Sequence, residues 1–159
     1  RATFATLCSM LRPGGRLAIS VYRKKSAARE ALDDCYREQI VPLPCDQAYA
    51  LSRQFTLLGK YLQTVTQQVM IEEDLPLFKI ERGSHSVQSL FYNHFLKCFY
   101  NPLFGEEYST LVNYDWYHPP YASRYEADEV AEWFKTEGLS LVQQDAIEAQ
   151  YYFLGEKSA

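Results

Sequence analysis

The sequence predicts a mixed α/β protein in which a long helical segment interrupts a sheet. Three observations indicate this fold class. A buried-strand pattern follows a glycine turn near the start, helical periodicity fills the middle, and a helix followed by two strand patterns closes the chain. The 159 residues correspond to about one domain, and the 47% hydrophobic content suits a packed core.

The first helix is predicted over residues 2–11, where apolar residues recur at helical spacing. Pro13 stops it because proline cannot continue a helix, and Gly14-Gly15 permit a tight turn. The run Arg16–Tyr22 then predicts a strand. Its nearly unbroken apolar character is typical of a strand covered on both faces, as in a parallel sheet with helices above and below.

A second helix, capped by Ser26, is predicted to run to Ile40, before Pro42 and Pro44. Its inward face is expected to carry Ala28, Leu32, Cys35 and Tyr36.

Asp46 opens the most regular pattern in the chain, in which apolar residues alternate spacings of three and four. They are Ala48, Leu51, Phe55, Leu58, Leu62, Val65 and Val69. A long amphipathic helix is predicted, and it favours packing within the protein. A coiled-coil seam is the alternative, so a homodimer through this helix stays open.

A further helix is predicted over residues 86–100, ended by Asn101-Pro102. Half of the chain's aromatic residues lie between Phe91 and Tyr125, around the rigid pair Pro119-Pro120. Such a density of rings predicts an apolar pocket wall with polar tips, because Tyr and Trp combine area with a hydrogen-bonding group.

The last predicted helix spans Ala127–Glu137, with acidic residues in its first turn and Gly138 at its end. Strands over residues 139–143 and 149–154 follow. The turn at residues 145–148 is short enough to join them as an antiparallel hairpin.

Composition argues against several classes of partner. The formal charge of -4 lacks the basic surplus of nucleic-acid binders. No apolar run approaches a spanning helix and no secretory signal is recognisable, so no membrane contact and a cytoplasmic location are expected. The four cysteines are widely spaced, which indicates free thiols in a reducing compartment.

The sequence opens at Arg1 directly in a helical pattern. This opening predicts a trimmed chain or the later part of a longer protein.

Three stretches, in this order, resemble the C-terminal half of a class I S-adenosylmethionine-dependent methyltransferase of a bacterial small-molecule branch. The stretches are Leu11-Arg12-Pro13-Gly14-Gly15-Arg16-Leu17, then Tyr114-Asp115-Trp116-Tyr117-His118-Pro119-Pro120-Tyr121, and then Arg124-Tyr125 with Glu129-Val130, Trp133-Phe134 and Gly138-Leu139. The first resembles the turn into the family's fifth strand. The others resemble its aromatic-proline segment and a helix that ends in glycine.

The resemblance implies the last three strands of a Rossmann-like sheet, with an antiparallel final hairpin and a large helical insertion. Residues 1–23 and 126–159 would form this partial core, and residues 24–125 an aromatic-rich substrate cap. The cofactor implied for the full-length protein is S-adenosylmethionine. Gly14-Gly15 precede a strand instead of following one, so no cofactor-binding residue is assigned in this chain, and the chain alone is expected to be inactive.

Two groups of residues are candidates for the acceptor site. Tyr22 and Arg23 end the predicted strand, where sheets of this class bind ligands. His118 could accept a proton from the acceptor, and Asp115 could orient that histidine or bind the acceptor itself. The alternatives are a carbonyl cap for His118 and a bond from Asp115 to its own backbone.

Trp116, Tyr117 and Tyr121 are expected to line the acceptor pocket, with burial in the core as the alternative. His94 and Cys98 lie four residues apart, with His85 nearby, but a second close ligand pair is missing, and we assign no metal site.

The sequence therefore predicts the C-terminal portion of a methyltransferase that acts on a small molecule. One alternative is a non-catalytic helical module that binds a partner protein or an apolar ligand through its aromatic surface. Another is a degenerate relative of the methyltransferases that kept the fold for interaction only.

Overall fold

The computed structural model describes residues 1–147 and 149–158, and the chain divides into two compact units. The first, here the sheet unit, comprises residues 1–24 and 123–159, and the second, the helical unit, is Lys25–Ala122. The helical unit begins one residue later and ends three residues earlier than the segment predicted at 24–125. Glu148, in the predicted hairpin turn, and Ala159 lie outside the described residues.

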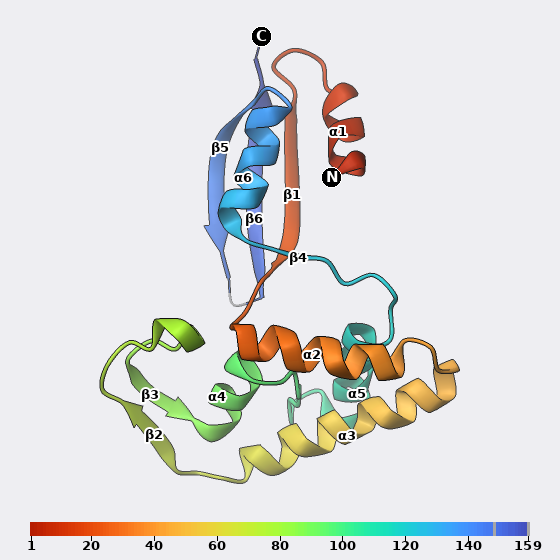
Figure 1. Ribbon diagram of the computed structural model, residues 1–159, viewed down its shortest axis with the longest axis vertical. Coiled ribbons are helices and arrows are strands. Elements are labelled where there is room, and N and C mark those ends of the chain that lie inside the picture. The colour runs from red at the N-terminus through yellow and green to blue at the C-terminus, as the bar shows by residue number, and fades with distance from the viewer. Residues whose placement is uncertain (148, 159) are drawn as a thin grey trace. The chain divides into compact units, whose positions relative to one another are not determined.

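The sheet unit contains a four-stranded mixed sheet in the order β4-β1-β6-β5 (Figure 1). Strand β1 (Arg16–Arg23) is parallel to β4 (Arg124–Tyr125) and antiparallel to β6 (Gln150–Lys157). Strand β5 (Leu139–Ala146) pairs antiparallel with β6. Strands β1 and β5 therefore run in the same direction with β6 reversed between them. The predicted mixed α/β class and the antiparallel hairpin are confirmed.

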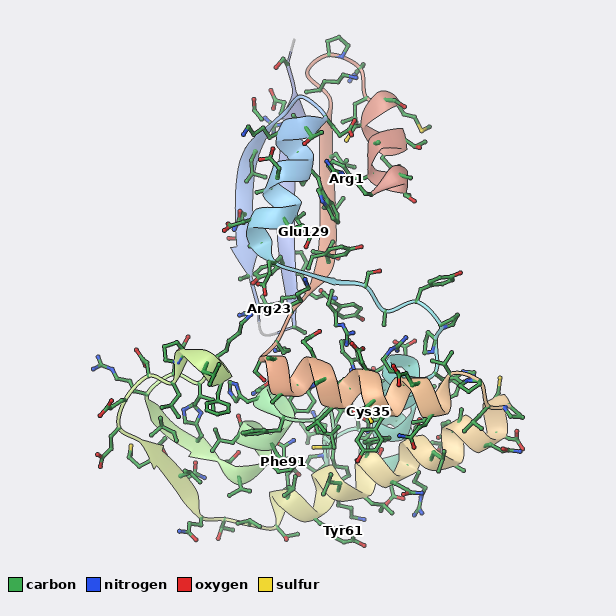
Figure 2. The ribbon with its side chains drawn as sticks, in the orientation of Figure 1. Arg1, Arg23, Cys35, Tyr61, Phe91 and Glu129 are labelled. Atoms are coloured by element: carbon green, nitrogen blue, oxygen red, sulfur yellow. The ribbon has the colours of Figure 1, made fainter. Side chains whose placement is uncertain are left out.

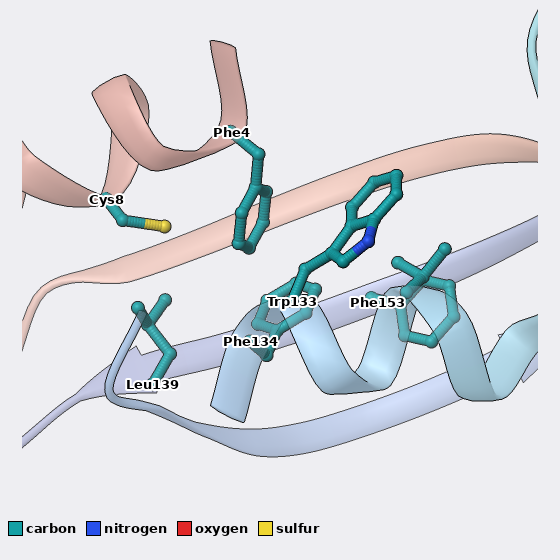
Figure 3. Close-up of a cluster of buried hydrophobic side chains, with 7 residues drawn as sticks. Phe4, Cys8, Trp133, Phe134, Leu139 and Phe153 are labelled. Atoms are coloured by element: carbon teal, nitrogen blue, oxygen red, sulfur yellow. The ribbon is translucent and has the colours of Figure 1, made fainter. Parts of the chain in front are cut away.

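Two helices cover one face of this sheet. They are α1 (Ala2–Ser9) and α6 (Ala127–Thr136), and Gly138 takes a positive φ of 72° where α6 ends. Their apolar side chains form one core, with Phe4 edge-on to Phe134 at 4.9 Å between ring centroids (Figure 3). The buried members are Phe4, Cys8, Val130, Trp133, Phe134, Leu139 and Phe153.

The sequence predicted that both faces of strand β1 are covered, but the structure covers only one. Its residues alternate between half-buried and exposed along the whole strand. Leu17, Ile19 and Val21 pack against the core that α1 and α6 form. The described residues of the sheet unit place no helix over the opposite face, so the apolar run reflects one covered face and one open face.

The helical unit contains four α-helices among its described residues. They are α2 (Ala27–Ile40), α3 (Cys45–Gln63), α4 (Val87–His94) and α5 (Gly105–Tyr117). Strands β2 (Gln68–Ile71) and β3 (Gly83–Ser86) form a small antiparallel sheet. The connection between them contains the short 3-10 helix η1 (Pro76–Phe78). Ser26 caps α2 as predicted, because its Oγ accepts from the Arg29 amide at 3.1 Å. None of the described helices has the length and apolar character required to cross a membrane.

Helix α3 is shorter than its apolar stripe predicted. It ends at Gln63, and Val69 instead pairs with His85 in the small sheet. The β-branched residues Val65, Thr66 and Val69 explain the change, since they favour extended backbone. The earlier part of the stripe packs into the core of the helical unit, which includes Ala48 and Phe55.

Helix α4 also ends earlier than predicted, and residues 96–101 continue as a non-helical segment, here the pinned segment. Every second backbone amide of this segment donates a hydrogen bond to a side chain of another helix. The amide of Lys97 donates to Asp33 Oδ1 at 3.0 Å, that of Phe99 to Asn113 Oδ1 at 2.9 Å, and that of Asn101 to Ser109 Oγ at 3.1 Å. These bonds replace the helical ones, so the predicted helix over 86–100 is wrong in its second half.

Gly59 allows α3 to approach the pinned segment closely. A Cβ atom at this position would lie 2.1 Å from the carbonyl oxygen of Cys98 and 3.2 Å from Cβ of Tyr100. The first distance is far inside van der Waals contact, and backbone atoms cannot move aside as a flexible side chain can. Gly59 is therefore a packing requirement and not only a helix position.

Gly59→Ala is expected to destabilise the chain by about 1–3 kcal/mol, because the added methyl overlaps the Cys98 carbonyl. The sign is diagnostic, since the same change in an exposed helix interior stabilises by about 1 kcal/mol. Denaturant unfolding measures the difference. Gln47→Ala, on the exposed side of α3, is the control and should change stability little. A Gly59→Ala variant as stable as the parent would contradict the close approach.

Candidate functional site

The predicted site residues fall into two groups that belong to different compact units. Tyr22 and Arg23 lie in the sheet unit. The five residues predicted from the aromatic-proline stretch lie in the helical unit: Asp115, Trp116, Tyr117, His118 and Tyr121. Two separate candidate sites result, one at the end of β1 and one around α5.

The centre of the helical unit is the carboxylate of Asp33, which is 1% exposed. Its Oδ2 accepts from Arg29 Nε at 2.6 Å and from Trp116 Nε1 at 2.9 Å. Its Oδ1 lies 3.0 Å from the Tyr117 hydroxyl and 3.0 Å from the Lys97 amide nitrogen. The charge is tolerated in the interior because it is paired and both oxygens are hydrogen-bonded. We call these five residues the Asp33 cluster.

Trp116 and Tyr117, predicted to line a pocket, lie in the core of the helical unit. They are 8% and 0% exposed, and the Tyr117 ring stacks on Phe55 at 4.1 Å between centroids. Burial, followed by the charge of Asp33, raises the pKa of the Tyr117 hydroxyl far above its ordinary value. Tyr117 therefore stays neutral at physiological pH.

His118 follows Tyr117 as the C-terminal cap residue of α5. Its Nε2 lies 3.1 Å from the carbonyl oxygen of Leu43, and its ring stacks on Tyr114 at 4.9 Å. A carbonyl only accepts, so this bond places a proton on Nε2 and leaves Nδ1 as the nitrogen that can accept one. Asp115 is exposed, and Tyr121 is 90% exposed.

Helix α2 does not bury the face that its sequence predicted. Leu32, Cys35 and Tyr36 are exposed, whereas the buried residues include three charged ones at a spacing of four: Arg29, Asp33 and Arg37. Arg37 holds the end of α5, because its guanidinium donates to the carbonyl oxygens of Trp116 and Pro119. The spacing of four between these charged residues could have indicated the buried face. The sequence analysis instead chose the face from the positions of the apolar residues.

Lys97 places an amine beside the Asp33 cluster. Its Nζ lies 4.4 Å from the centre of the Trp116 ring, within the range of a cation–π contact. Burial, and next the positive charge of Arg29, lowers the pKa of the Lys97 amine to about 8. Asp33 and Asp115 oppose this shift, and Lys25 adds to it. Lys97 therefore loses its proton more readily than an ordinary lysine does.

The second candidate site lies at the carboxyl end of β1, where Tyr22 and Arg23 pair with Arg124 and Tyr125 of β4. Figure 2 shows Arg23 at this end of the strand. Its Nη1 donates to the Ile147 carbonyl at 3.3 Å, and its guanidinium lies 5.3 Å from the centre of the Tyr151 ring. Its Nε is buried without a hydrogen-bond partner among the described residues.

A groove of about 290 Å³ opens at this end of the sheet unit. Its walls combine hydroxyl, amide and apolar groups, contributed by Ser20, Val21, Tyr22, Ser123, Tyr125 and Gln150. Ligands of parallel α/β sheets bind at the carboxyl ends of strands, which is where this groove lies. Of the residues predicted for substrate contact, Tyr22 is thus part of a cavity wall.

Among the described residues, no glycine-rich turn of the kind that binds nucleotides follows β1. Gly14 and Gly15 precede β1, and β1 runs directly into Arg23-Lys24 without a glycine-rich turn. Nor does the described part of the chain bring together three His, Cys, Asp or Glu side chains that could hold a metal ion.

Comparisons with protein-family models, curated proteins and solved structures gave no match. The functional interpretation therefore depends on the two sites and on the sequence stretches that carry the resemblance.

Asp33→Asn is expected to lower the unfolding free energy by about 3–5 kcal/mol, because it leaves the buried Arg29 guanidinium without its counter-charge. Chemical denaturation measures the loss. Glu38→Gln changes an exposed carboxylate on the same helix and should be nearly neutral. Equal losses in the two variants would show that the Asp33 cluster does not stabilise the unit.

Lys97 is expected to titrate near pH 8, below the ordinary lysine value of 10.5. NMR of chain labelled at the lysine side chains measures its midpoint directly, and Lys97→Arg assigns the signal. Since the folded pKa is lower than the unfolded value of 10.5, the unfolded chain binds more protons at Lys97 between these values, and the contribution of Lys97 to stability should rise with pH from about 8 to 10.5. The buried Cys98 thiol, whose pKa is raised to about 12, contributes in the opposite direction above about pH 9. A Lys97 midpoint above pH 10 would contradict the burial of the amine.

Proposed function

We propose that this chain is the C-terminal part of an S-adenosylmethionine-dependent methyltransferase that acts on a small molecule. The observation that carries the proposal is the strand arrangement of the sheet unit. Strands β1 and β5 run in one direction, α6 lies between them in the chain, and β6 returns antiparallel between them. The resemblance leads us to expect three last strands with a helix before an antiparallel final hairpin.

The groove at the end of β1 supports an acceptor site. It lies at the carboxyl end of a parallel pair, and Tyr22 and Ser123 contribute hydroxyl-bearing side chains to its wall. Arg23, the next residue of β1, is not part of the groove wall. In this proposal Tyr22 and Ser123 bind and orient the polar part of the acceptor.

Methyl transfer is an in-line displacement that depends mainly on positioning and on the exclusion of water. S-adenosylmethionine, bound by residues outside this chain, supplies the methyl group. In this proposal the residues of the sheet-unit groove provide the orientation of the acceptor. His118, the predicted base, lies in the helical unit, where Nε2 donates to the Leu43 carbonyl and Nδ1 is the nitrogen that can accept a proton.

The product of the whole reading frame that encodes this chain tests the proposal. We expect it to bind S-adenosylmethionine in calorimetry and to transfer a labelled methyl group to a member of a panel of phenols, amines and carboxylic acids. Replacing residues 25–122 by a short linker should leave cofactor binding and lower transfer by about a hundredfold or more. The 159-residue chain alone should not bind the cofactor.

A full-length product that binds no S-adenosylmethionine would overturn the proposal. Full transfer activity after removal of residues 25–122 would leave the enzyme but contradict the role given to the helical unit.

A further inference from the structure

A groove of about 330 Å³ lies between α2 and α3 in the helical unit. The two helices diverge from the turn at residues 41–44, as Figure 1 shows, with Cys35 on α2 and Tyr61 on α3 marked in Figure 2. Residues of α2 at positions i, i+3 and i+4, and of α3 at i, i+3, i+4 and i+7, line the groove, so each helix contributes one continuous face. The lining residues are Tyr36, Gln39, Ile40, Leu51, Gln54, Phe55, Leu58 and Leu96.

The groove has an apolar floor and a partly exposed rim. Ile40, Phe55 and Leu96 are between 2% and 8% exposed, whereas Tyr36 and Leu51 are each 37% exposed. The Tyr36 ring meets Phe55 edge to face at 5.2 Å and 82°, which forms an aromatic corner. Exposed apolar area at the rim and a closed floor favour a ligand that removes the rim from water.

The polar groups of the groove are all uncharged. They are the amides of Gln39 and Gln54 and the hydroxyl of Tyr36. The Gln39 amide nitrogen donates to the Cys35 carbonyl at 3.2 Å, and the Gln54 side chain makes no hydrogen bond within the described residues. An ionised ligand would find no counter-charge in this lining, whereas an amide can either donate to or accept from a neutral group.

We propose that this groove binds a small, uncharged, largely apolar organic molecule with one hydroxyl or carbonyl group that pairs with Gln54. The volume falls at the lower end of small-molecule pockets, which span about 300–1,000 Å³. A protein partner fits less well, because a stable interface covers about 800 Å² on each side, more than eight side chains with a buried floor can offer. The inference does not rest on methyl transfer, since only α2, α3 and Leu96 form the groove.

The test uses 1-naphthol and naphthalene-1-sulfonate, which share a ring system but differ in charge, with the 159-residue chain. Calorimetry should give saturable 1:1 binding of 1-naphthol with a Kd below about 1 mM, and at least about tenfold weaker binding of the sulfonate. Leu51→Glu places a charge on the rim and should weaken 1-naphthol binding about tenfold or more. Leu111→Glu, which changes a 51% exposed leucine outside the groove, is the matched control and should bind as the parent does.

Gln54→Leu separates the polar contact from the apolar one. It should weaken 1-naphthol several-fold while leaving unsubstituted naphthalene unchanged or tighter. Circular dichroism of each variant verifies the fold. Binding of 1-naphthol that is absent below about 1 mM, or equal in the parent and in a folded Leu51→Glu variant, would overturn the proposal. A dimer in sedimentation that Leu51→Glu dissolves would also overturn it, since a second copy would then occupy the groove.

Discussion

The buried carboxylate of Asp33 is the interaction on which the helical unit depends. Four donors converge on its two oxygens, and they come from α2, from the pinned segment and from α5. A buried charge of this kind is costly to desolvate, and the cost is offset only while every partner is in place. The positions of α5 and of the pinned segment are therefore coupled to one side chain. Arg37, one turn further along α2, extends the same face to the Trp116 and Pro119 carbonyls.

The two candidate sites differ in character as a consequence. Two of the three aromatic residues that the sequence offered as a pocket wall, Trp116 and Tyr117, are buried in the Asp33 cluster and the core, whereas Tyr121 is exposed. A groove with hydroxyl and amide groups lies at the carboxyl end of β1, and a largely apolar groove lies between α2 and α3.

Local patterns predicted the two helices and the three long strands of the sheet unit and the starts of α2, α3 and α4, but they missed α5 and the small β2–β3 sheet. The turn at Gly14, the cap at Ser26, the helix that ends at Gly138 and the closing hairpin each depend on a few neighbouring residues, and the structure bears them out. The pinned segment could not be predicted in this way, because its backbone partners lie on helices far away in the sequence. The prediction of the buried face of α2 was wrong for a related reason, since charged residues enter a core only when distant partners pair with them.

The claim most central to this account is that buried side chains, and not helical bonds, order the pinned segment. Residue-resolved hydrogen exchange of the chain tests it directly. The account predicts that the amides of Lys97 and Phe99 are protected to an extent comparable with the middle of α5, and that Asp33→Asn reduces the protection of Lys97 more than that of Phe99, whose partner is Asn113. Exchange of both amides at the rate of an open loop in the parent chain would contradict it.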